Sequence, residues 1–236
     1  MFIKTRSFLF AVIYNSTGVF YGTLSLFLWP LPLRLRHRVI MGWTQLAVFL
    51  ARWICGLRYQ VIGRENLPAK GETVLILSKH QSTWETLFLQ NLFWPACTVL
   101  KKELLRIPFF GWGLAALNPI PIDRDNPREA LRKVKTNGVQ RLQNGYNLLL
   151  FPEGTRVAPG EKGKYARSGA DIAVESGKNI IPIAVNSGVY WPTKQMEKVP
   201  GCITIVVGPP ISPEGKTSRE LIGEVETWIE STMKTL

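Results

Sequence analysis

Histidine and cysteine are scarce in this chain. Its 236 residues include two histidines and three cysteines. The cysteines, Cys55, Cys97 and Cys202, lie far apart in sequence and form neither a metal-ligand spacing nor an even disulfide framework. We therefore expect no metal site, and we expect the cysteines to be reduced and surrounded by apolar residues, as in a domain that lies in the cytoplasm.

Acidic residues are scarcest in the first 70 residues. That stretch carries nine Lys or Arg and one acid, Glu65, so it holds eight of the twelve excess positive charges. Most of it is also strongly apolar. A basic, apolar and aromatic stretch is typical of a membrane surface more than of a nucleic-acid partner. No recognised nucleic-acid motif is present, and we expect no nucleic-acid partner.

The longest apolar stretch covers residues 7–33, which is enough to cross a bilayer, since crossing takes about 20 residues. The polar run Asn15-Ser16-Thr17 interrupts it, so a helix lying in the membrane plane is also open. The basic cluster Arg34–Arg38 follows. Both a solvated turn and contact with lipid headgroups are open for that cluster.

Residues 39–57 repeat apolar side chains at helical spacing, which predicts an amphipathic helix. A helix facing the protein core is the alternative, but its neighbours favour a helix on or in the membrane. We therefore predict that residues 1–58 form hydrophobic, membrane-associated helices.

Residues 59–236 show alternating strand and helix patterns, which predict an α/β domain with a mostly parallel sheet and covering helices. One helix is predicted to start after Asn126, with Pro127 and Glu129 in its first turn, and to stop near Gly145. The last helix begins with a capping box, Thr217 to Glu220. Strands are predicted at Thr73–Leu77, Thr98–Leu100, Pro119–Ile122, Asn147–Phe151, Ile180–Val185 and Ile203–Val207.

A histidine and an acid, His80 and Glu85, lie five residues apart where a predicted strand passes into a predicted helix. An imidazole oriented by a carboxylate can take a proton from a hydroxyl near neutral pH. Such pairs are often merely structural, so the pair alone does not establish a reaction.

The string Phe151–Arg156 follows another predicted strand, at the edge of the sheet where sites collect. Arg156 suits a phosphate because its planar fork donates two hydrogen bonds, and Gly154 allows close backbone approach. A carboxylate would repel a phosphate, so Glu153 is expected to hold an arginine or a backbone N–H. A plain turn with a solvated arginine is the alternative.

Three weaker candidates also follow or interrupt predicted strands. Arg124 is placed to reach a phosphate, or to pair with Asp123 or Asp125. Lys101 offers a point charge on a flexible stem, or is simply solvated. Pro182 interrupts a strand, which predicts a sheet edge, a bulge or the margin of a site.

The strings KHQSTWE, KKELLRIP, IDRD, FPEGTR and IPIAV occur in this order across residues 79–185. Together they resemble the glycerolipid acyltransferase family, and most closely its bacterial 1-acyl-glycerol-3-phosphate acyltransferases, over about residues 60–210. The resemblance implies a catalytic pair in which His80 is the general base and Glu85 holds its imidazole. It implies an acceptor-phosphate site from Arg124, Glu153, Gly154 and Arg156, with Lys101 a further candidate, and places Pro182 near the acyl or catalytic region.

One residue departs from the family pattern, because most members carry Asp at the position of Glu85. Glutamate is one methylene longer, so the backbone or the rotamer must compensate if the contact with His80 is to be kept.

The resemblance implies transfer of an acyl group from acyl-CoA or acyl-carrier protein to lysophosphatidate, on the cytoplasmic face of the cytoplasmic membrane. It implies no metal and no bound cofactor. Two alternatives are open: an acyltransferase that uses another lysolipid acceptor, and a non-catalytic membrane protein that binds lipid. Acyl chain length, donor type and oligomeric state stay open.

Overall fold

The computed structural model describes residues 2–123 and 125–236, with only the backbone of Pro127. Arg124, predicted above to bind phosphate, lies outside the described residues.

The described residues form a seven-stranded sheet in the order β1-β7-β6-β2-β5-β3-β4. Neighbouring strands are parallel except for β6 and β7, which are antiparallel. The strands are β1 (Leu57–Ile62), β2 (Leu75–Ser78), β3 (Ala96–Lys101), β4 (Ile120–Ile122), β5 (Asn147–Leu150), β6 (Ile180–Val185) and β7 (Gly201–Val207). The helices are α1 (Phe2–Phe27), α2 (Leu33–Cys55), α3 (Trp84–Leu92), α4 (Phe110–Ala116), α5 (Pro127–Gln143), α6 (Ser168–Ser176), α7 (Ser187–Tyr190) and α8 (Ser218–Met233), with short 3-10 turns at Arg64–Asn66 and Lys102–Arg106.

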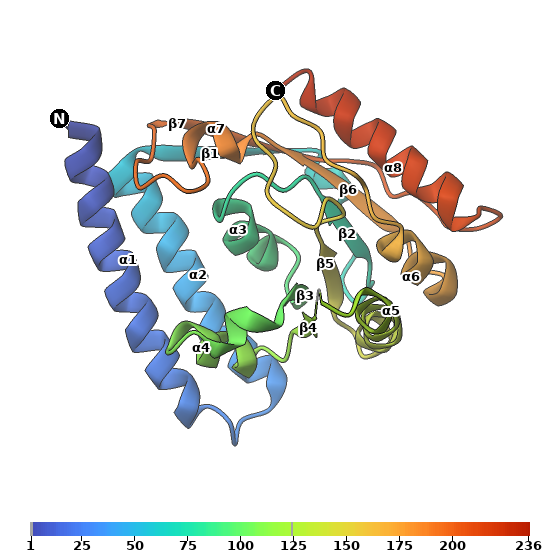
Figure 1. The fold of residues 1–236 in the computed structure, drawn as a ribbon, viewed down its shortest axis with the longest axis horizontal. Coiled ribbons are helices and arrows are strands. Elements are labelled where there is room, and N and C mark those ends of the chain that lie inside the picture. Colours follow the sequence, from blue (N-terminus) through green and yellow to red (C-terminus); the bar gives the residue numbers. More distant parts are fainter. Residues whose placement is uncertain (1, 124) are drawn as a thin grey trace.

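Helices cover both faces of the sheet, with α1 to α4 on one side and α5, α6 and α8 on the other (Figure 1). Alternate residues of a strand point to opposite faces. In β2, Ile76 joins the core with α2 and α3, whereas Leu75 and Leu77 join the core with α5, α6 and α8. The predicted α/β class, with a mostly parallel and covered sheet, is confirmed.

Each of the six predicted strands is present, with ends within two residues of the prediction. The two predicted caps are also present: the Asn126 side chain accepts from Glu129 N, and Thr217 with Glu220 forms a capping box. Strand β1 was not predicted, although exposed Arg58 and Gln60 alternate with residues that face inward, which is itself a strand pattern. It lies at the edge of the sheet and pairs only with β7.

Helix α2 starts earlier than predicted, at Leu33 instead of residue 39. The basic cluster Arg34–Arg38 therefore belongs to the helix, and the alternative of a turn is wrong. The helix ends at Cys55, after which Gly56 has a φ of 73°, the left-handed conformation that glycine tolerates best. The predicted boundary at residue 58 lies inside β1, and the division into 1–58 and 59–236 stays a prediction.

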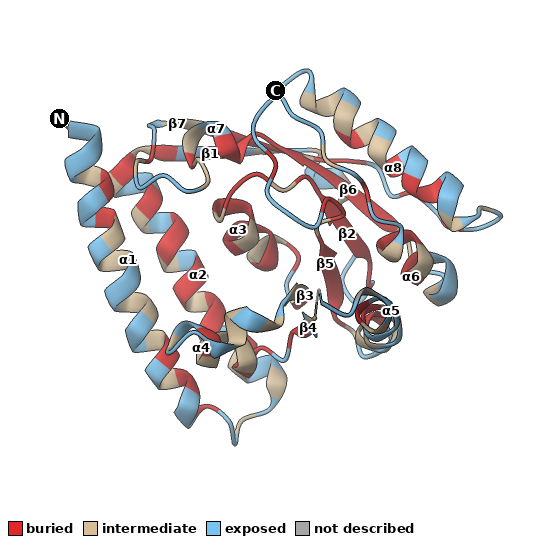
Figure 2. Ribbon diagram, viewed as in Figure 1, coloured by how far each residue is buried: buried red, intermediate tan, exposed pale blue. Residues whose placement is uncertain are grey.

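Helix α1 is 26 residues long and, by length and composition, is able to cross a membrane. Much of its surface is exposed (Figure 2). The exposed residues include large apolar ones, among them Phe8, Phe20 and Phe27. Its inner side packs on the protein: the Phe10 ring lies 5.3 Å from Trp191, edge to face, and Tyr14 lies 5.1 Å from Trp43. One apolar side of α1 is therefore covered and the other is uncovered.

Pro182 was predicted to mark a sheet edge, a bulge or a site margin, and the first of these is wrong. It lies in β6, which runs between β2 and β7. Its carbonyl accepts from Gly208 N and faces β7, just beyond the last ladder pair, Ile183 and Val207. The backbone nitrogen of Pro182, which carries no hydrogen, faces the same side. The ladder with β7 ends there, so an interior strand tolerates the proline.

Candidate active site

The predicted motif strings meet at one edge of the sheet. Strands β2, β5 and β3 are parallel neighbours, so their carboxyl ends lie together. His80 follows β2, the segment Phe151–Arg156 follows β5, and Lys101 ends β3. Lys101 is exposed there. Residues far apart in sequence thus lie together at the carboxyl ends of these three strands.

His80 and Glu85 form a direct pair, with 2.9 Å between His80 Nδ1 and Glu85 Oε1. The side chain of Glu85 is fully buried, while that of His80 is 14% exposed. The imidazole also stacks on the Phe151 ring, with ring centroids 4.0 Å apart and planes 23° apart. Glutamate at this position therefore keeps contact with the imidazole, and the histidine retains access to solvent.

Glu85 accepts hydrogen bonds on both carboxylate oxygens. Backbone N–H groups of Gln81 and Ser82 donate to Oε1 at 2.8 and 2.7 Å, in addition to His80. The hydroxyls of Ser82 and Ser187 donate to Oε2, the latter at 2.6 Å. Burial on its own raises the pKa of Glu85, but hydrogen bonds from His80, Ser187 and Ser82 outweigh it and hold the pKa below its usual value.

This environment fixes the tautomer of His80. An ionised carboxylate only accepts hydrogen bonds, so Nδ1 carries the proton that is donated to Glu85. Nε2 is then the basic nitrogen, and it has no hydrogen-bond partner among the described residues. A basic imidazole nitrogen with partial exposure, backed by a buried carboxylate, is the arrangement that a general base needs.

Residues that follow β5 hold the backbone of His80 in place. Glu153 accepts from the backbone N–H of His80 at 3.0 Å, and Val157 N donates to the carbonyl of His80 at 2.8 Å. The Glu153 side chain is fully buried, and its other oxygen binds Lys79. The sequence predicted that Glu153 would hold an arginine or a backbone N–H, and it holds the N–H of His80 together with a lysine.

The exposed part of the same segment carries Gly154 and Arg156. Gly154 has a φ of 66°, which accounts for glycine at this turn. Arg156 forms no ion pair with any described residue, so its guanidinium is available to an anion. Asp123, one of the predicted partners of Arg124, forms an ion pair with Lys102.

Three residues at the site were not singled out from the sequence: Lys79, Ser82 and Ser187. Lys79 and Ser82 flank His80 in the same string, so their position was the available signal. Ser187 starts α7, five residues after Pro182, and nothing in the local sequence marks it. Pro182 itself lies against Gly208: a Cβ added to Gly208 would lie 2.7 Å from the Cγ of Pro182. The strand that contains Pro182 is therefore connected to Glu85 through Ser187, which follows that strand.

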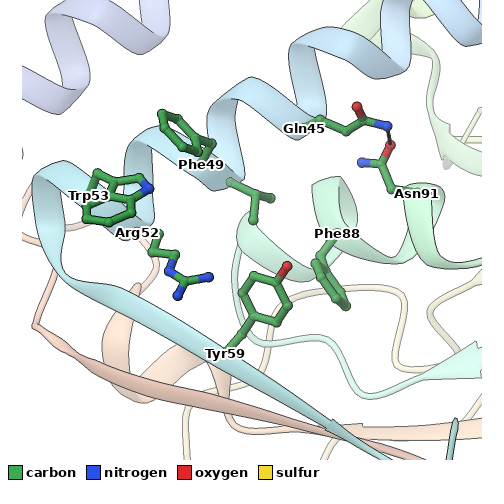
Figure 3. Close-up of a pocket in the computed structure, with 8 residues that line it drawn as sticks. Gln45, Phe49, Arg52, Trp53, Tyr59, Phe88 and Asn91 are labelled. Atoms are coloured by element: carbon green, nitrogen blue, oxygen red, sulfur yellow. Dashed lines mark hydrogen bonds between the residues drawn. The ribbon is translucent and has the colours of Figure 1, made fainter.

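A separate groove of about 420 Å³ lies between α2, β1 and α3 (Figure 3). Exposed Phe49 and Trp53 flank it, and the Arg52 guanidinium lies 5.8 Å from the Trp53 ring centroid. Exposed aromatic rings beside an arginine are typical of a surface that meets lipid. Its lining consists of Gln45, Val48, Phe49, Arg52, Trp53, Tyr59, Phe88 and Asn91.

Comparison with known proteins agrees with this geometry. Residues 58–186 match the acyltransferase family. The chain is 46% identical over 233 residues to the 1-acyl-sn-glycerol-3-phosphate acyltransferase of Pseudomonas aeruginosa, covering 97% of this chain and 90% of that protein. It is 32% identical over 182 residues to the enzyme of that name from Saccharomyces cerevisiae, covering 75% of this chain and 59% of that protein.

The fold is shared with the crystal structure of the 1-acyl-sn-glycerophosphate acyltransferase PlsC from Thermotoga maritima, at a TM-score of 0.77 and 23% identity. That match covers 99% of this chain and 94% of the other. The chain therefore belongs to the acyltransferase family, as its ordered motifs predicted.

Proposed function

We propose that this chain transfers an acyl group from a thioester donor to the free hydroxyl of 1-acyl-glycerol-3-phosphate and so forms phosphatidate. The observation that carries the proposal is the His80–Glu85 pair, whose basic Nε2 lies at the sheet edge that also presents Arg156. The Pseudomonas relative that bears the name of this activity supports the choice of acceptor.

The first step is removal of a proton. His80 Nε2 takes the proton of the acceptor hydroxyl while the hydroxyl oxygen attacks the thioester carbonyl. The imidazole becomes a cation, which the buried Glu85 carboxylate stabilises through Nδ1–H at 2.9 Å. No covalent enzyme intermediate is required, since the acceptor is itself the nucleophile.

The second step is collapse of the tetrahedral intermediate. The carbon–sulfur bond breaks, the carbonyl reforms, and the leaving thiolate takes the proton from His80 Nε2. The imidazole returns to its neutral form and the ester is complete. Because the same nitrogen accepts and returns one proton, the enzyme ends each turnover unchanged.

Arg156 is proposed to bind the acceptor phosphate, with Gly154 leaving room for the close approach of that group. Lys101 at the end of β3 is a further candidate for the same anion, and Arg124 keeps this role as a prediction. Arginine forms two parallel hydrogen bonds to phosphate and holds it in a defined orientation. A fixed phosphate places the acceptor hydroxyl at a constant distance from His80.

The exposed side of α1 and the aromatic rim of the groove beside α2 are proposed to contact the membrane that holds the lipid. Acyl-CoA and acyl-carrier protein are both anionic, and both suit a chain with a net charge of +12. Because these donors are made in the cytoplasm, we place the site at the cytoplasmic face of the cytoplasmic membrane.

The test is acyl transfer by purified protein in vesicles, with lysophosphatidate and a labelled acyl thioester of each donor type. His80→Ala should lower kcat by about 10²- to 10⁴-fold, the usual contribution of a general base. His37→Gln, at the other histidine, is the matched control and should stay close to wild type. Full activity in His80→Ala would remove the proposed base.

The same assay distinguishes the alternatives. A panel of lysolipids with other headgroups identifies a different acceptor if one of them is used better than lysophosphatidate. Lysolipid binding without product from any acceptor would instead support a non-catalytic role. The proposed reaction uses no metal or bound cofactor, so dialysis against a chelator should leave the rate unchanged.

A further inference from the structure

Lys79, the residue before the proposed general base, carries a buried ammonium group. The Lys79 side chain is 1% exposed, although it carries a charge that is costly to remove from water. Its three N–H bonds are all used: Nζ donates to Glu153 Oε1 at 2.8 Å, to Glu230 Oε1 at 2.9 Å and to the carbonyl of Glu161 at 3.0 Å. A fully satisfied buried lysine holds its partners in one arrangement.

These partners come from two separate parts of the chain. Lys79 lies between the segment that joins β5 to α6, which contains Glu153 and Glu161, and helix α8, which carries Glu230. The Tyr165 hydroxyl also donates to Glu230 Oε1, at 2.7 Å. The last helix, distant from His80 in sequence, is therefore connected to the site by buried polar contacts.

The contacts continue to His80. Glu153 accepts from Lys79 on Oε1 and from the His80 backbone N–H on Oε2, at 3.0 Å. Gly163 N also donates to Oε1, at 3.1 Å. One carboxylate thus joins the side chain of Lys79 to the backbone of the next residue. Any shift of this carboxylate moves the backbone that carries the imidazole.

We propose that Lys79 and Glu230 are positioning residues, which hold Glu153 and through it fix the backbone of His80 for proton transfer. The inference rests on the proposed function, because it assigns these residues to the same reaction. Neither residue touches the reacting atoms. Helix α8 then contributes to catalysis by anchoring the ammonium group, in addition to covering the sheet.

Glu230→Ala is the informative variant. It removes one carboxylate from a cluster of one lysine and two glutamates, so Lys79 keeps Glu153 as its counter-charge and the fold should survive. Glu230 is 19% exposed, and water can enter the space that its side chain leaves. Glu230→Gln is the conservative variant, because its amide oxygen still accepts from Lys79 and Tyr165.

Glu226→Ala supplies the matched control. Glu226 lies one turn earlier on the same helix and forms a partly exposed ion pair with Lys162. Glu230→Ala should lower kcat by about 10-fold or more, because small misplacements of a catalytic group have large effects on rate. KM for acceptor and donor should change by less than about 2-fold, Glu230→Gln should recover most of kcat, and Glu226→Ala should resemble wild type.

Hydrogen exchange gives a second readout that does not need the reaction. The peptide containing His80 should exchange faster in Glu230→Ala than in wild type or Glu226→Ala. An unchanged exchange rate in that peptide would overturn the inference. So would a Glu230→Ala variant that melts at a lower temperature but keeps the kcat of wild type. If wild type does not acylate lysophosphatidate, the proposed function fails, while the exchange data still decide the positioning role.

Discussion

The hydroxyl of Ser187 lies 2.6 Å from Oε2 of Glu85, although the two residues are 102 positions apart in sequence. Ser187 begins α7 after β6, whereas Glu85 lies in the first turn of α3 after β2. Strands β6 and β2 are parallel neighbours, so the segments that follow them meet. The orienting carboxylate is thus held from a second strand as well as from its own loop.

Shortening Glu85 should break this arrangement. Aspartate is shorter by one C–C bond, about 1.5 Å, so it cannot reach His80 Nδ1 and Ser187 together unless the backbone moves. We expect Glu85→Asp to lower kcat by about 10-fold or more, with little change in KM for either substrate. Steady-state kinetics with each substrate varied in turn is the measurement.

Ser187→Ala should have a smaller effect, because Glu85 keeps four other donors. The net contribution of one hydrogen bond is about 1 kcal/mol, so a fall in kcat of about 5-fold is expected. Adding Ser187→Ala to Glu85→Asp should then cost little more, since the aspartate has already lost this contact. Fully multiplicative effects in the double variant would contradict the shared contact.

Removing the exposed arginine should weaken acceptor use. Arg156→Ala should raise KM for lysophosphatidate by about 10-fold or more and leave KM for the donor nearly unchanged, since a charged hydrogen bond to phosphate is lost. Arg219→Ala, an exposed arginine on α8, serves as the control for charge alone. Equal effects of the two substitutions would point to general attraction of anionic lipid instead of a phosphate site at Arg156.

The second histidine should make the fold sensitive to acid. His37 is buried, and its Nε2–H donates to the carbonyl of Leu117 at 2.8 Å. Burial is the main cause that lowers the pKa of His37 below its ordinary 6.5. The unfolded chain therefore binds more protons than the folded chain below pH 6.5, and the free energy of unfolding falls as the pH drops from 6.5 toward the folded-state pKa.

His37→Gln should remove this dependence, because an amide can donate to the same carbonyl and does not titrate. Between pH 7.5 and 5.5, wild type should lose up to about 1 kcal/mol more unfolding free energy than the variant. Denaturant unfolding at the two pH values measures it. Parallel losses in both proteins would place the acid sensitivity elsewhere.

The uncovered side of α1 should bind membranes. Phe20 and Phe27 are 64% and 74% exposed, so replacing both with Ser should leave the fold intact. Each buried phenylalanine side chain is worth about 1.5 to 3 kcal/mol, so the double variant should sediment with anionic vesicles at least about 10-fold less well. Leu131→Ser with Val174→Ser, exposed apolar residues on α5 and α6, should bind vesicles like wild type.

Local patterns predicted much of this fold because their causes are local. The cap of α5 at Asn126 and the capping box of α8 depend on side chains within one turn of the backbone groups that they satisfy. Strand β6 consists entirely of apolar residues, Pro182 among them, because both of its faces are covered. Strand β1 was missed although it shows the alternation of exposed and inward residues that is typical of a half-covered strand.

The sequence by itself determined the α/β class, the pairing of His80 with Glu85 and the family, since each depends on residues close together or on strings in a set order. Only the tertiary structure decided that Glu153 faces inward to His80 and Lys79, that Ser187 supports Glu85, and that Glu230 anchors Lys79. Those contacts join segments that follow different strands. The register and order of the sheet set which of these segments meet, and no local pattern encodes either.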